Sequence, residues 1–187
     1  MKDKIAKIIN ESIDTKEHVR KNEVANIKKA VEVIVRSLKA GGKLIVFGNG
    51  GSAADSQHIA AELVGRFKKE RKALAAIALT TNTSTLTAIA NDYGYDVAFS
   101  RQIDALGRKG DVALGISTSG NSKNVIEALK KARAAGITTI GMTGGDGGKM
   151  KADCDILINT GVKDTARTQE SHIMIGHILC ELIEDEF

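Results

Sequence analysis

The stretch IVFGNGGSAADSQHIAAELVGRF, residues 45–67, decides the fold of this chain. It begins as a short apolar run, turns through the glycine-rich residues 48–52, and continues as a predicted helix that carries His58 and Glu62. Because backbone N–H groups point outward at the N-terminus of a helix, such a turn is a ready site for an anion. The stretch therefore predicts a strand, an anion-binding turn and a helix with two polar side chains.

The same alternation continues along the chain. Short apolar runs predict strands at residues 43–47, 75–79, 112–117, 138–142 and 156–159. Helical patterns separate them at 53–66, 84–91, 97–106 and 121–135, with a short helix near 149 and a final one at 164–185. Strands that alternate with helices favour a parallel sheet covered on both faces. We expect a three-layer α/β/α sandwich with a five-stranded parallel sheet, of the flavodoxin-like or Rossmann-like class, whose ligands bind beyond the carboxyl ends of the strands.

Residues 3–38 precede the first strand and are typical of one or two helices. Aliphatic residues recur there at three- and four-residue steps, with Lys, Glu and Asn between them. This apolar stripe either packs on the core or joins a bundle with other subunits. No linker, repeat or low-complexity tract interrupts the chain, so we expect one domain over residues 1–187, with a helical extension at about 1–40 and an α/β core at about 43–187.

The composition is that of a soluble globular protein. The chain has 187 residues, of which 42% are hydrophobic and 27% charged. It contains no apolar run of the ~20 residues that a membrane span needs, and its first residues lack a signal-peptide pattern, so we expect a cytoplasmic protein without a membrane partner. The net charge of +4 comes from scattered lysines, and only 3% of the residues are aromatic, so we expect an anionic metabolite rather than a nucleic acid as partner. Cys154 and Cys180 stand far apart and form no CxxC pair, so we expect buried, reduced thiols.

The glycine turn formally matches a dinucleotide-binding fingerprint, because Gly48, Gly50 and Ala53 satisfy G-x-G-x-x-[GA]. That fingerprint also needs an acidic residue at the end of the second strand to hold the ribose hydroxyls. The second predicted strand ends in LTTNTST, which has no acid, and the P-loop motif G-x-x-x-x-G-K-[ST] does not occur. We therefore expect no nucleotide cofactor.

The third predicted strand ends in GISTSGNSKNV, residues 115–125. Four hydroxyl side chains fall within six residues there, those of Ser117, Thr118, Ser119 and Ser122. A turn with one N-cap is the simpler explanation, but four hydroxyls exceed what capping needs. Together with the N-terminus of the helix that follows, they predict a cradle for a phosphate monoester.

Two predicted helices carry polar side chains that can face one cavity. His58 and Glu62 are four residues apart and share one helix face. Gln169 and His177, on the last predicted helix, are eight residues apart, which separates them by about 80° around the helix axis. A carboxylate and an imidazole can act as general base and acid, and two imidazoles with two oxygen donors can bind zinc, so both functions stay open.

The other two histidines are expected to lie outside this cavity. His172 points to another side of the last helix, and we expect it at the periphery. His18 lies in the polar N-terminal segment, and we expect it to be solvated.

An anchored phosphate, a carboxylate and an imidazole suit one reaction, which is proton transfer beside the carbonyl of a sugar phosphate. A base removes a proton from the carbon next to the carbonyl, and an acid transfers protons to and from the oxygen atoms. The resulting enediol interchanges an aldose and a ketose, and no redox cofactor is required.

Four blocks of the sequence resemble the phosphoheptose isomerases, which are sugar isomerase (SIS) domain proteins. The blocks are FGNGGSAADSQHIAAELVGRF, ANDYGYDVAFSRQI, GDVALGISTSGNSKNV and DTARTQESHIMIGHILCELIE, and they occur in the family's order. The resemblance implies conversion of D-sedoheptulose 7-phosphate into D-glycero-D-manno-heptose 7-phosphate, the first step towards nucleotide-activated heptose for lipopolysaccharide or related glycans. It also implies a homotetramer whose sites are completed across subunits, which would give the N-terminal helix a bundle to join.

The resemblance also implies roles for individual residues. Glu62 is similar to the base that moves the proton between C1 and C2, and His177 to its acid partner. Some members bind one zinc per subunit through the residues that match His58, Glu62, Gln169 and His177, and a zinc-bound carboxylate would be a poorer free base. The implied substrate-binding residues are Asn49, Gly50, Gly51, Ser52, Glu62, Asn91, Asp92, Ser117, Thr118, Ser119, Ser122 and Gln169.

Two positions depart from the family's pattern. Thr168 stands where isoleucine is common, and Lys123 stands where a proline is common after the serine. Neither change removes a proposed catalytic group, but both bear on how the far end of the substrate fits.

Two other functions remain open from the sequence. A non-catalytic SIS protein of the replication-initiator-associating type keeps much of the glycine turn but not the full set of carboxylate and histidine residues, whereas Glu62, Gln169 and His177 are all present here. An isomerase of another sugar phosphate is the third candidate, because the depth of the cavity sets the length of the sugar.

Overall fold

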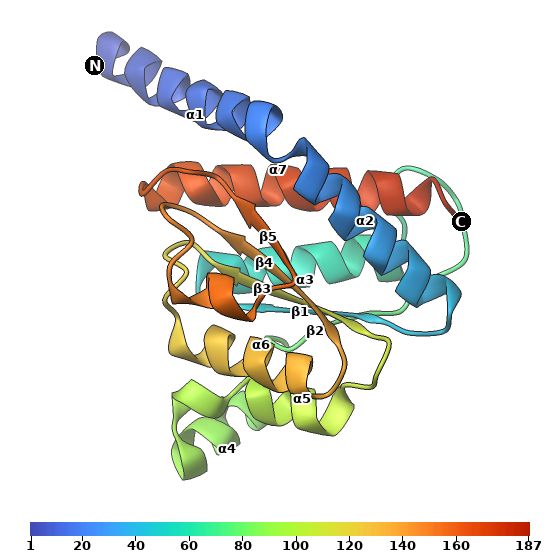
Figure 1. Ribbon diagram of the computed structural model, residues 1–187. Coiled ribbons are helices and arrows are strands. Elements are labelled where there is room, and N and C mark those ends of the chain that lie inside the picture. The colour runs from blue at the N-terminus through green and yellow to red at the C-terminus, as the bar shows by residue number, and fades with distance from the viewer.

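The computed structural model describes all residues of the chain, 1–187, as a sheet with helices on both faces (Figure 1). The helices are α1 (Lys2–Asn22), α2 (Val24–Lys39), α3 (Gly51–Val64), α4 (Thr83–Tyr93), α5 (Ser100–Leu106), α6 (Lys123–Ala134) and α7 (Thr165–Glu184). The strands are β1 (Leu44–Gly48), β2 (Ala76–Ala78), β3 (Val112–Ser117), β4 (Thr138–Thr143) and β5 (Ile156–Asn159), and two short 3-10 helices are η1 (Tyr95–Val97) and η2 (Lys149–Asp153). No helix combines the length and the apolar character that crossing a membrane requires.

The five strands are all parallel and lie in the order β2-β1-β3-β4-β5. Helices α2, α3 and α7 cover one face of the sheet, and α5 and α6 cover the other, with α4 outside them (Figure 1). This order is the flavodoxin-like one. The predicted three-layer sandwich with five parallel strands is confirmed, and the one predicted helix at 97–106 is divided into η1 and α5.

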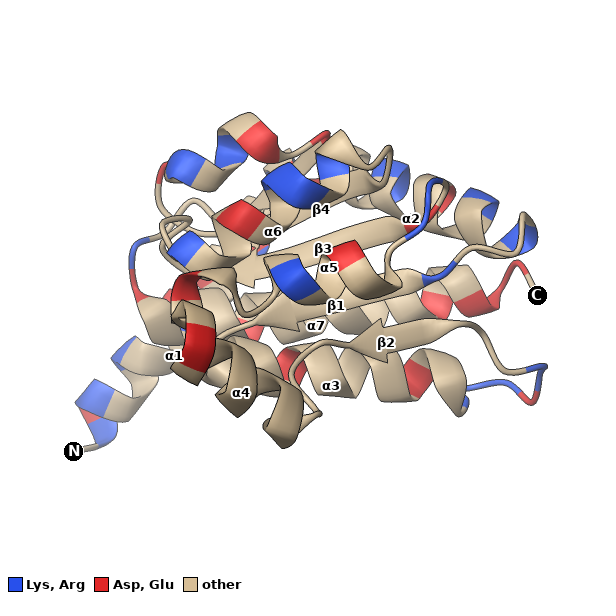
Figure 2. Ribbon diagram, turned by 90° about the horizontal axis from the view of Figure 1, so that it is seen from below, with Lys and Arg blue, Asp and Glu red and all other residues tan.

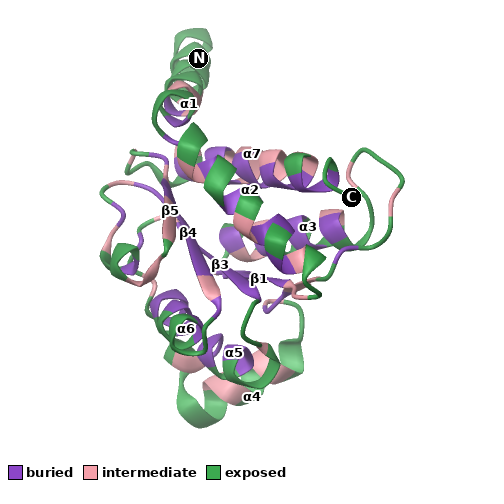
Figure 3. Ribbon diagram, turned by 45° about the vertical axis from the view of Figure 1, so that its right-hand side comes forward, coloured by how far each residue is buried: buried purple, intermediate pink, exposed green.

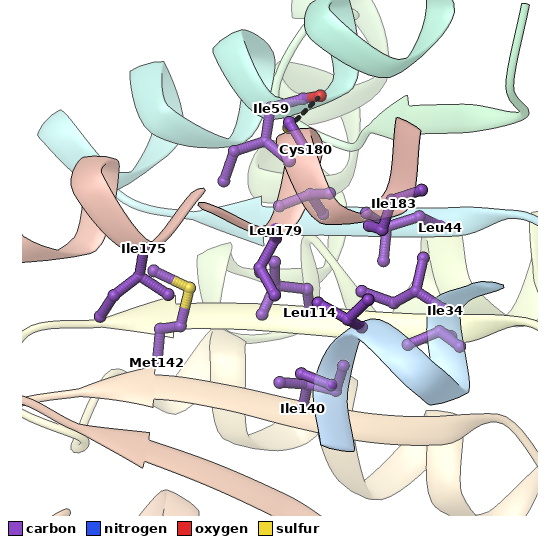
Figure 4. Close-up of a cluster of buried hydrophobic side chains, with 14 of the residues drawn as sticks. Ile34, Leu44, Ile59, Leu114, Ile140, Met142, Ile175, Leu179, Cys180 and Ile183 are labelled. Carbon is purple, nitrogen blue, oxygen red and sulfur yellow. Dashed lines mark hydrogen bonds between the residues drawn. The ribbon is translucent and has the colours of Figure 1, made fainter. Parts of the chain in front are cut away.

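The larger of two apolar clusters lies between the sheet and α2, α3 and α7. Figure 4 shows Ile175, Leu179 and Ile183 of α7 pointing toward the sheet, where they meet Leu114 and Met142. Their spacing of four residues places them on one helix face, so the second half of α7 is anchored on the sheet. The smaller cluster lies under α5 and α6 and includes Phe47 and Phe99, whose ring centroids are 5.6 Å apart.

The N-terminal segment forms two helices, and α1 projects from the body of the molecule (Figure 1). Only Thr15 and Val19 of α1 are buried, and Figure 3 shows the rest of this helix largely exposed. Arg167 of α7 fixes its position by donating a hydrogen bond to the Ile8 carbonyl oxygen at 3.0 Å. Of the apolar residues of α1, Val19 therefore packs on the core, whereas Ile5, Ile8, Ile9 and Ile13 do not.

Both cysteines are free, as the sequence predicts. Cys180 is buried and Cys154 is half-buried. Burial raises the pKa of each thiol to about 12, so both remain protonated at neutral pH.

The sequence expectation for His172 is wrong, because its side chain is completely buried where α7 packs on the end of β4. Position 172 lies on the same face of α7 as Ile175 and Leu179, which is the face that covers the sheet. One ring nitrogen, Nε2, lies 3.2 Å from the Thr143 carbonyl oxygen, and Nδ1 has no partner. His18 is exposed on α1, as expected.

The burial of His172 makes the stability of the fold depend on pH. Burial lowers the pKa of this imidazole from 6.5 to about 4, although its contact with the Thr143 carbonyl opposes the shift. Between these pH values the unfolded chain binds a proton that the folded chain does not. The contribution of neutral His172 to the free energy of unfolding is therefore fully present above about pH 6.5 and is lost as the pH falls toward 4. The loss from this one group is about 3 kcal/mol.

Urea unfolding at a series of pH values measures this effect. We expect His172→Leu to remove this part of the slope, because leucine binds no proton. The control His18→Gln should keep the slope of the unsubstituted chain. An unchanged slope in His172→Leu would contradict the assignment.

Candidate active site

The candidate site lies where the sheet order reverses. β1 pairs with both β2 and β3, and the helices that follow β1 and β3, α3 and α6, lie on opposite faces of the sheet (Figure 1). Gly48 at the end of β1 pairs with Ile116 near the end of β3, so the turns that follow these strands adjoin. A crevice at such a point is where ligands bind in open α/β sheets.

The glycine turn after β1 has little room for side chains. A Cβ at Gly48 would come 2.8 Å from the Ile116 carbonyl oxygen, and a Cβ at Gly51 would overlap the side-chain amide of Gln169. Gly50 has a φ of +58°, in the region that favours glycine. The turn therefore lies directly beneath Gln169 of α7, so two of the sequence-predicted groups are brought together.

The side chain of Asn49 ties this turn to its surroundings. Its Nδ2 donates to Asn124 Oδ1 and its Oδ1 accepts from Asn124 Nδ2, both at 2.9 Å. The same Oδ1 accepts a hydrogen bond from the Tyr95 hydroxyl at 3.0 Å. Asn124 and Tyr95 were missed by the sequence reasoning, because a reciprocal amide pair between residues 75 positions apart leaves no local pattern.

The four hydroxyl residues after β3 surround the N-terminus of α6. Ser117 Oγ and Ser122 Oγ lie 3.0 Å apart, and Ser119 Oγ accepts from the Asn121 N–H at 3.2 Å. Ser122 occupies the N-cap position of α6, but its side chain forms no capping hydrogen bond. Helix capping therefore does not account for these hydroxyls. The Lys123 and Asn124 N–H groups at the start of α6 are free for an anion, whereas the Val125 N–H donates to the Ser122 carbonyl oxygen.

Backbone contacts brace this hydroxyl turn from behind. Gly120, with a φ of +65°, packs so closely on the backbone of Gly147 that a Cβ would overlap it. The Gly120 carbonyl oxygen also accepts from the Met150 N–H at 2.9 Å. The turn after β4 thus fixes the shape of the turn after β3.

Three of the four predicted catalytic and metal-binding residues converge on one point. His58 Nε2 lies 3.1 Å from Glu62 Oε1 and 3.1 Å from His177 Nε2. The ligand atoms of the three residues all lie within 4.8 Å of one another. His58 is about half exposed and Glu62 is one-quarter exposed, so the cluster is open to a small molecule.

The convergence depends on a close approach of α3 and α7. A Cβ at Gly176 would come 2.9 Å from two side-chain carbons of Ile59. Ile59 follows His58 and Gly176 precedes His177, so this contact lies directly behind the two imidazoles. The absence of a side chain at position 176 lets the helices approach until the imidazoles touch.

Asp55 is a further polar group beside the cluster, and the sequence reasoning missed it. It is half-buried one turn before His58, and its Oδ2 has no hydrogen-bond partner. Burial raises the pKa of this carboxyl, although the nearby His58 and His177 side chains oppose the shift. Its spacing of three residues from His58 is the signal that could have drawn attention to it.

The donor atoms of the cluster form a group of the kind that binds a metal ion. In a tetrahedral zinc site with bonds of about 2.0–2.1 Å, neighbouring donor atoms lie about 3.3 Å apart. The two contacts of His58 Nε2 are close to this value, and two imidazole nitrogens with a carboxylate oxygen are donors that zinc accepts.

Asn91 and Asp92 lie near the end of α4, where both are exposed. The Asn91 side-chain amide donates to Asp92 Oδ1 at 2.8 Å. The link from this segment to the glycine turn is made by Tyr95, and Asp96 forms an ion pair with Lys123 of α6 at 3.6 Å.

Comparisons with known proteins show the family of this chain. A family model described as the SIS domain matches residues 8–144. The phosphoheptose isomerase of Clostridium acetobutylicum is 53% identical over 188 residues, which cover 100% of this chain and 96% of that protein. This chain belongs to the phosphoheptose isomerase family.

Solved structures of phosphoheptose isomerases have the same fold. That of the phosphoheptose isomerase from Neisseria gonorrhoeae matches with a TM-score of 0.93 and 48% identity over 98% of both chains. That of the enzyme from Francisella tularensis matches with a TM-score of 0.95 and 36% identity, covering 98% of this chain and 97% of the other. The family assignment made from the sequence is therefore confirmed.

The two positions that depart from the pattern of the phosphoheptose isomerases have local explanations. Thr168 is completely buried, and its hydroxyl lies 3.3 Å from the Thr160 hydroxyl and donates to the Val162 carbonyl oxygen at 3.2 Å. Lys123 is exposed and pairs with Asp96. Thr168 thus fastens the segment before α7, and Lys123 connects the hydroxyl turn to η1.

Proposed function

We propose that this chain is an aldose–ketose isomerase that converts D-sedoheptulose 7-phosphate into D-glycero-D-manno-heptose 7-phosphate. The observation that carries the proposal is the convergence of Glu62, His58 and His177. Glu62 and His58 lie on the helix that follows the glycine turn, and His177 lies on the helix whose Gln169 contacts that turn. Membership in the phosphoheptose isomerase family supports the reaction class and the substrate.

The phosphate is proposed to bind in the hydroxyl turn. Ser117, Thr118, Ser119 and Ser122 offer hydroxyl donors, and the N-terminus of α6 favours negative charge. Lys123, which directly follows Ser122, pairs with Asp96. The sugar chain is proposed to lie over the glycine turn, in contact with the other implied substrate residues, which are Asn49, Gly50, Gly51, Ser52, Asn91, Asp92 and Gln169.

The reaction is proposed to begin when the Glu62 carboxylate removes a proton from C1 of the ketose. The carbonyl oxygen at C2 takes a proton from His177, which gives an enediol. Glu62 then returns its proton to C2, while the hydroxyl at C1 gives its proton to the His177 imidazole, which completes the aldose and restores both groups. The carboxylate and the imidazole come from different helices, so the enediol can lie between them.

The two other functions are less well supported. A non-catalytic SIS protein has no use for a carboxylate and two imidazoles held within 4.8 Å of one another. An isomerase of a shorter sugar phosphate would use the same groups. The substrate test below separates that function from the proposed one.

Substitution of the two proposed catalytic groups tests the mechanism. We expect Glu62→Gln and His177→Gln each to lower kcat on sedoheptulose 7-phosphate by 10² or more, because each removes a proton-transfer group. The thermal midpoint and the particle size should not change. The controls Glu127→Gln and His18→Gln, at exposed positions on α6 and α1, should keep full activity. Full activity in either catalytic variant would exclude the mechanism.

The same assay in deuterated water reports the proton transfer. We expect deuterium at C2 of the aldoheptose, because the proton on the carboxylate exchanges with solvent. A product without deuterium, or turnover only of pentose or hexose phosphates, would contradict the proposed reaction or substrate.

We further propose that His58, Glu62, Gln169 and His177 can hold one zinc ion per subunit. A bound zinc would polarise the carbonyl oxygen of the substrate as a Lewis acid. Metal analysis of the purified protein should find up to one zinc per chain, and His58→Gln should lower this content while His18→Gln does not. Zinc content that is the same in both variants would contradict this ligand set.

We also propose a cytoplasmic homotetramer of single SIS-domain chains, with sites completed at subunit interfaces and the product used for lipopolysaccharide or related glycans. The apolar residues of α1 that its own chain leaves uncovered support the assembly. They are Ile5, Ile8, Ile9 and Ile13, which are 41–55% exposed. A groove lined by Ile13, Val24 and Ile178, among others, continues this surface onto α2 and α7.

Sedimentation measures the proposed assembly. We expect a particle of about four times the 19.8 kDa chain mass. Ile9→Asp should shift it to smaller species, because a carboxylate would be buried in the interface. Asn10→Asp adds the same charge one residue away and should leave the mass unchanged. A monomer in the unsubstituted protein would contradict the proposal.

A further inference from the structure

A buried ion pair holds the loop that connects α3 to β2. The side chains of Arg71, in this loop, and Glu184, at the end of α7, are 3% and 1% exposed, with 3.2 Å between Arg71 Nε and Glu184 Oε2. The Glu184 carboxylate also accepts three backbone N–H bonds, from Phe67 at 2.9 Å and from Lys68 and Lys69 at 2.7 Å each. Burial opposes ionisation of this carboxyl, but the three N–H donors and Arg71 outweigh it and hold its pKa below the usual range.

The Arg71 guanidinium fastens the other end of the loop to α3. It donates to the carbonyl oxygens of Glu62 and Leu63 at 2.9 Å and of Gly65 at 3.0 Å. The last carbonyl groups of a helix have no partner within the helix, so the guanidinium caps α3. One ion pair therefore connects the helix that carries Glu62 to the helix that carries His177.

Charges around this pair complement one another. Lys68 pairs with Glu181 at 2.8 Å, and Lys69 contacts Asp185. Figure 2 shows the basic residues of the loop after α3 and the acidic residues near the end of α7 at the same end of the molecule. These outer pairs are exposed and add little stability. The buried pair is the one that fixes the geometry.

The consequence of this arrangement is a contact with the candidate site. The Phe67 ring stacks on the His177 imidazole, with centroids 5.5 Å apart and an interplanar angle of 28°. Nε2 of the same imidazole lies 3.1 Å from His58 Nε2. His177 and Glu184 are seven residues apart on α7, so the residue that holds the Phe67 backbone and the residue that Phe67 touches share one helix face.

We propose that Phe67 is a positioning residue for His177 and that Glu184, with Arg71, holds Phe67 in place. The planar ring limits rotation of the imidazole, so that Nε2 stays directed at His58 and Glu62. The effect of Phe67 on catalysis rests on the proposed isomerase function, because His177 must act on substrate. The effect of Phe67 on the position of the imidazole does not rest on it. Fold stability alone does not require this arrangement, because two buried charges are expensive to desolvate and an apolar pair would serve as well.

Kinetics of Phe67 variants test the effect on catalysis. We expect Phe67→Ala to lower kcat for sedoheptulose 7-phosphate by about 10–100-fold, as a misplaced catalytic group does, while KM changes less than threefold. KM should hold because the phosphate cradle lies on β3 and α6. Phe67→Tyr keeps the ring and should restore kcat. The control Phe187→Ala removes an exposed ring at the C-terminus and should have no effect.

A second measurement needs no turnover. Histidine side-chain ¹H–¹⁵N correlations, recorded in EDTA and assigned with His177→Gln, report how the imidazole is held. We expect one sharp set for His177 in the unsubstituted protein and in Phe67→Tyr, and broadened or doubled signals in Phe67→Ala. Glu184→Gln should give the same change, because its amide cannot accept all three backbone N–H bonds.

The two measurements separate this proposal from the proposed function. If the protein does not isomerise sedoheptulose 7-phosphate, the proposed function fails and the imidazole signals still decide whether Phe67 positions His177. Unchanged His177 signals in Phe67→Ala would overturn the proposal, whatever happens to kcat. An unchanged kcat in an active enzyme would overturn it as well. Should Phe67→Ala not fold, Phe67→Leu keeps the apolar volume without the plane and is expected to give the same signature.

Discussion

The close approach of α3 and α7 at Gly176 is the contact on which the candidate site depends. Packed helices are usually separated by 8–10 Å, according to the side chains between them. Here Ile59 fits against a position without a side chain, and His58 and His177 flank that contact. The imidazole nitrogens meet at 3.1 Å as a result. A general acid–base pair or a metal site both need this spacing, and neither helix could provide it alone.

The two turns at the sheet reversal depend on the same kind of constraint. Gly48 permits the glycine turn to pass close to the Ile116 carbonyl, and Gly120 permits the hydroxyl turn to rest on Gly147. The reciprocal amide pair of Asn49 and Asn124 then joins the two turns across the reversal. The proposed phosphate cradle and the proposed reacting groups thereby lie on one frame, and the loop around Arg71 and Glu184 adds the support that we propose for His177.

The strands, the glycine turn and the hydroxyl turn could be predicted because each has a local signature. Apolar runs of four to six residues, bounded by glycine and polar residues, correspond to β1, β3 and β4. The sequence misjudged His172, because the periodicity of a helix does not say how much of its circumference is covered. His172 lies on the same face of α7 as Ile175, and the sheet covers that face so completely that both side chains are buried.

The sequence by itself determined the class of fold, the order of its elements and the residue types from which the site is built. Hydrophobic periodicity and glycine placement are properties of neighbouring residues, so they can be recognised in a single sequence. The tertiary structure alone decided which distant side chains meet: His58 with His177, Asn49 with Asn124, and Phe67 with His177 under the control of Glu184. These contacts join residues more than 70 positions apart, and their geometry follows from how closely helices and turns pack.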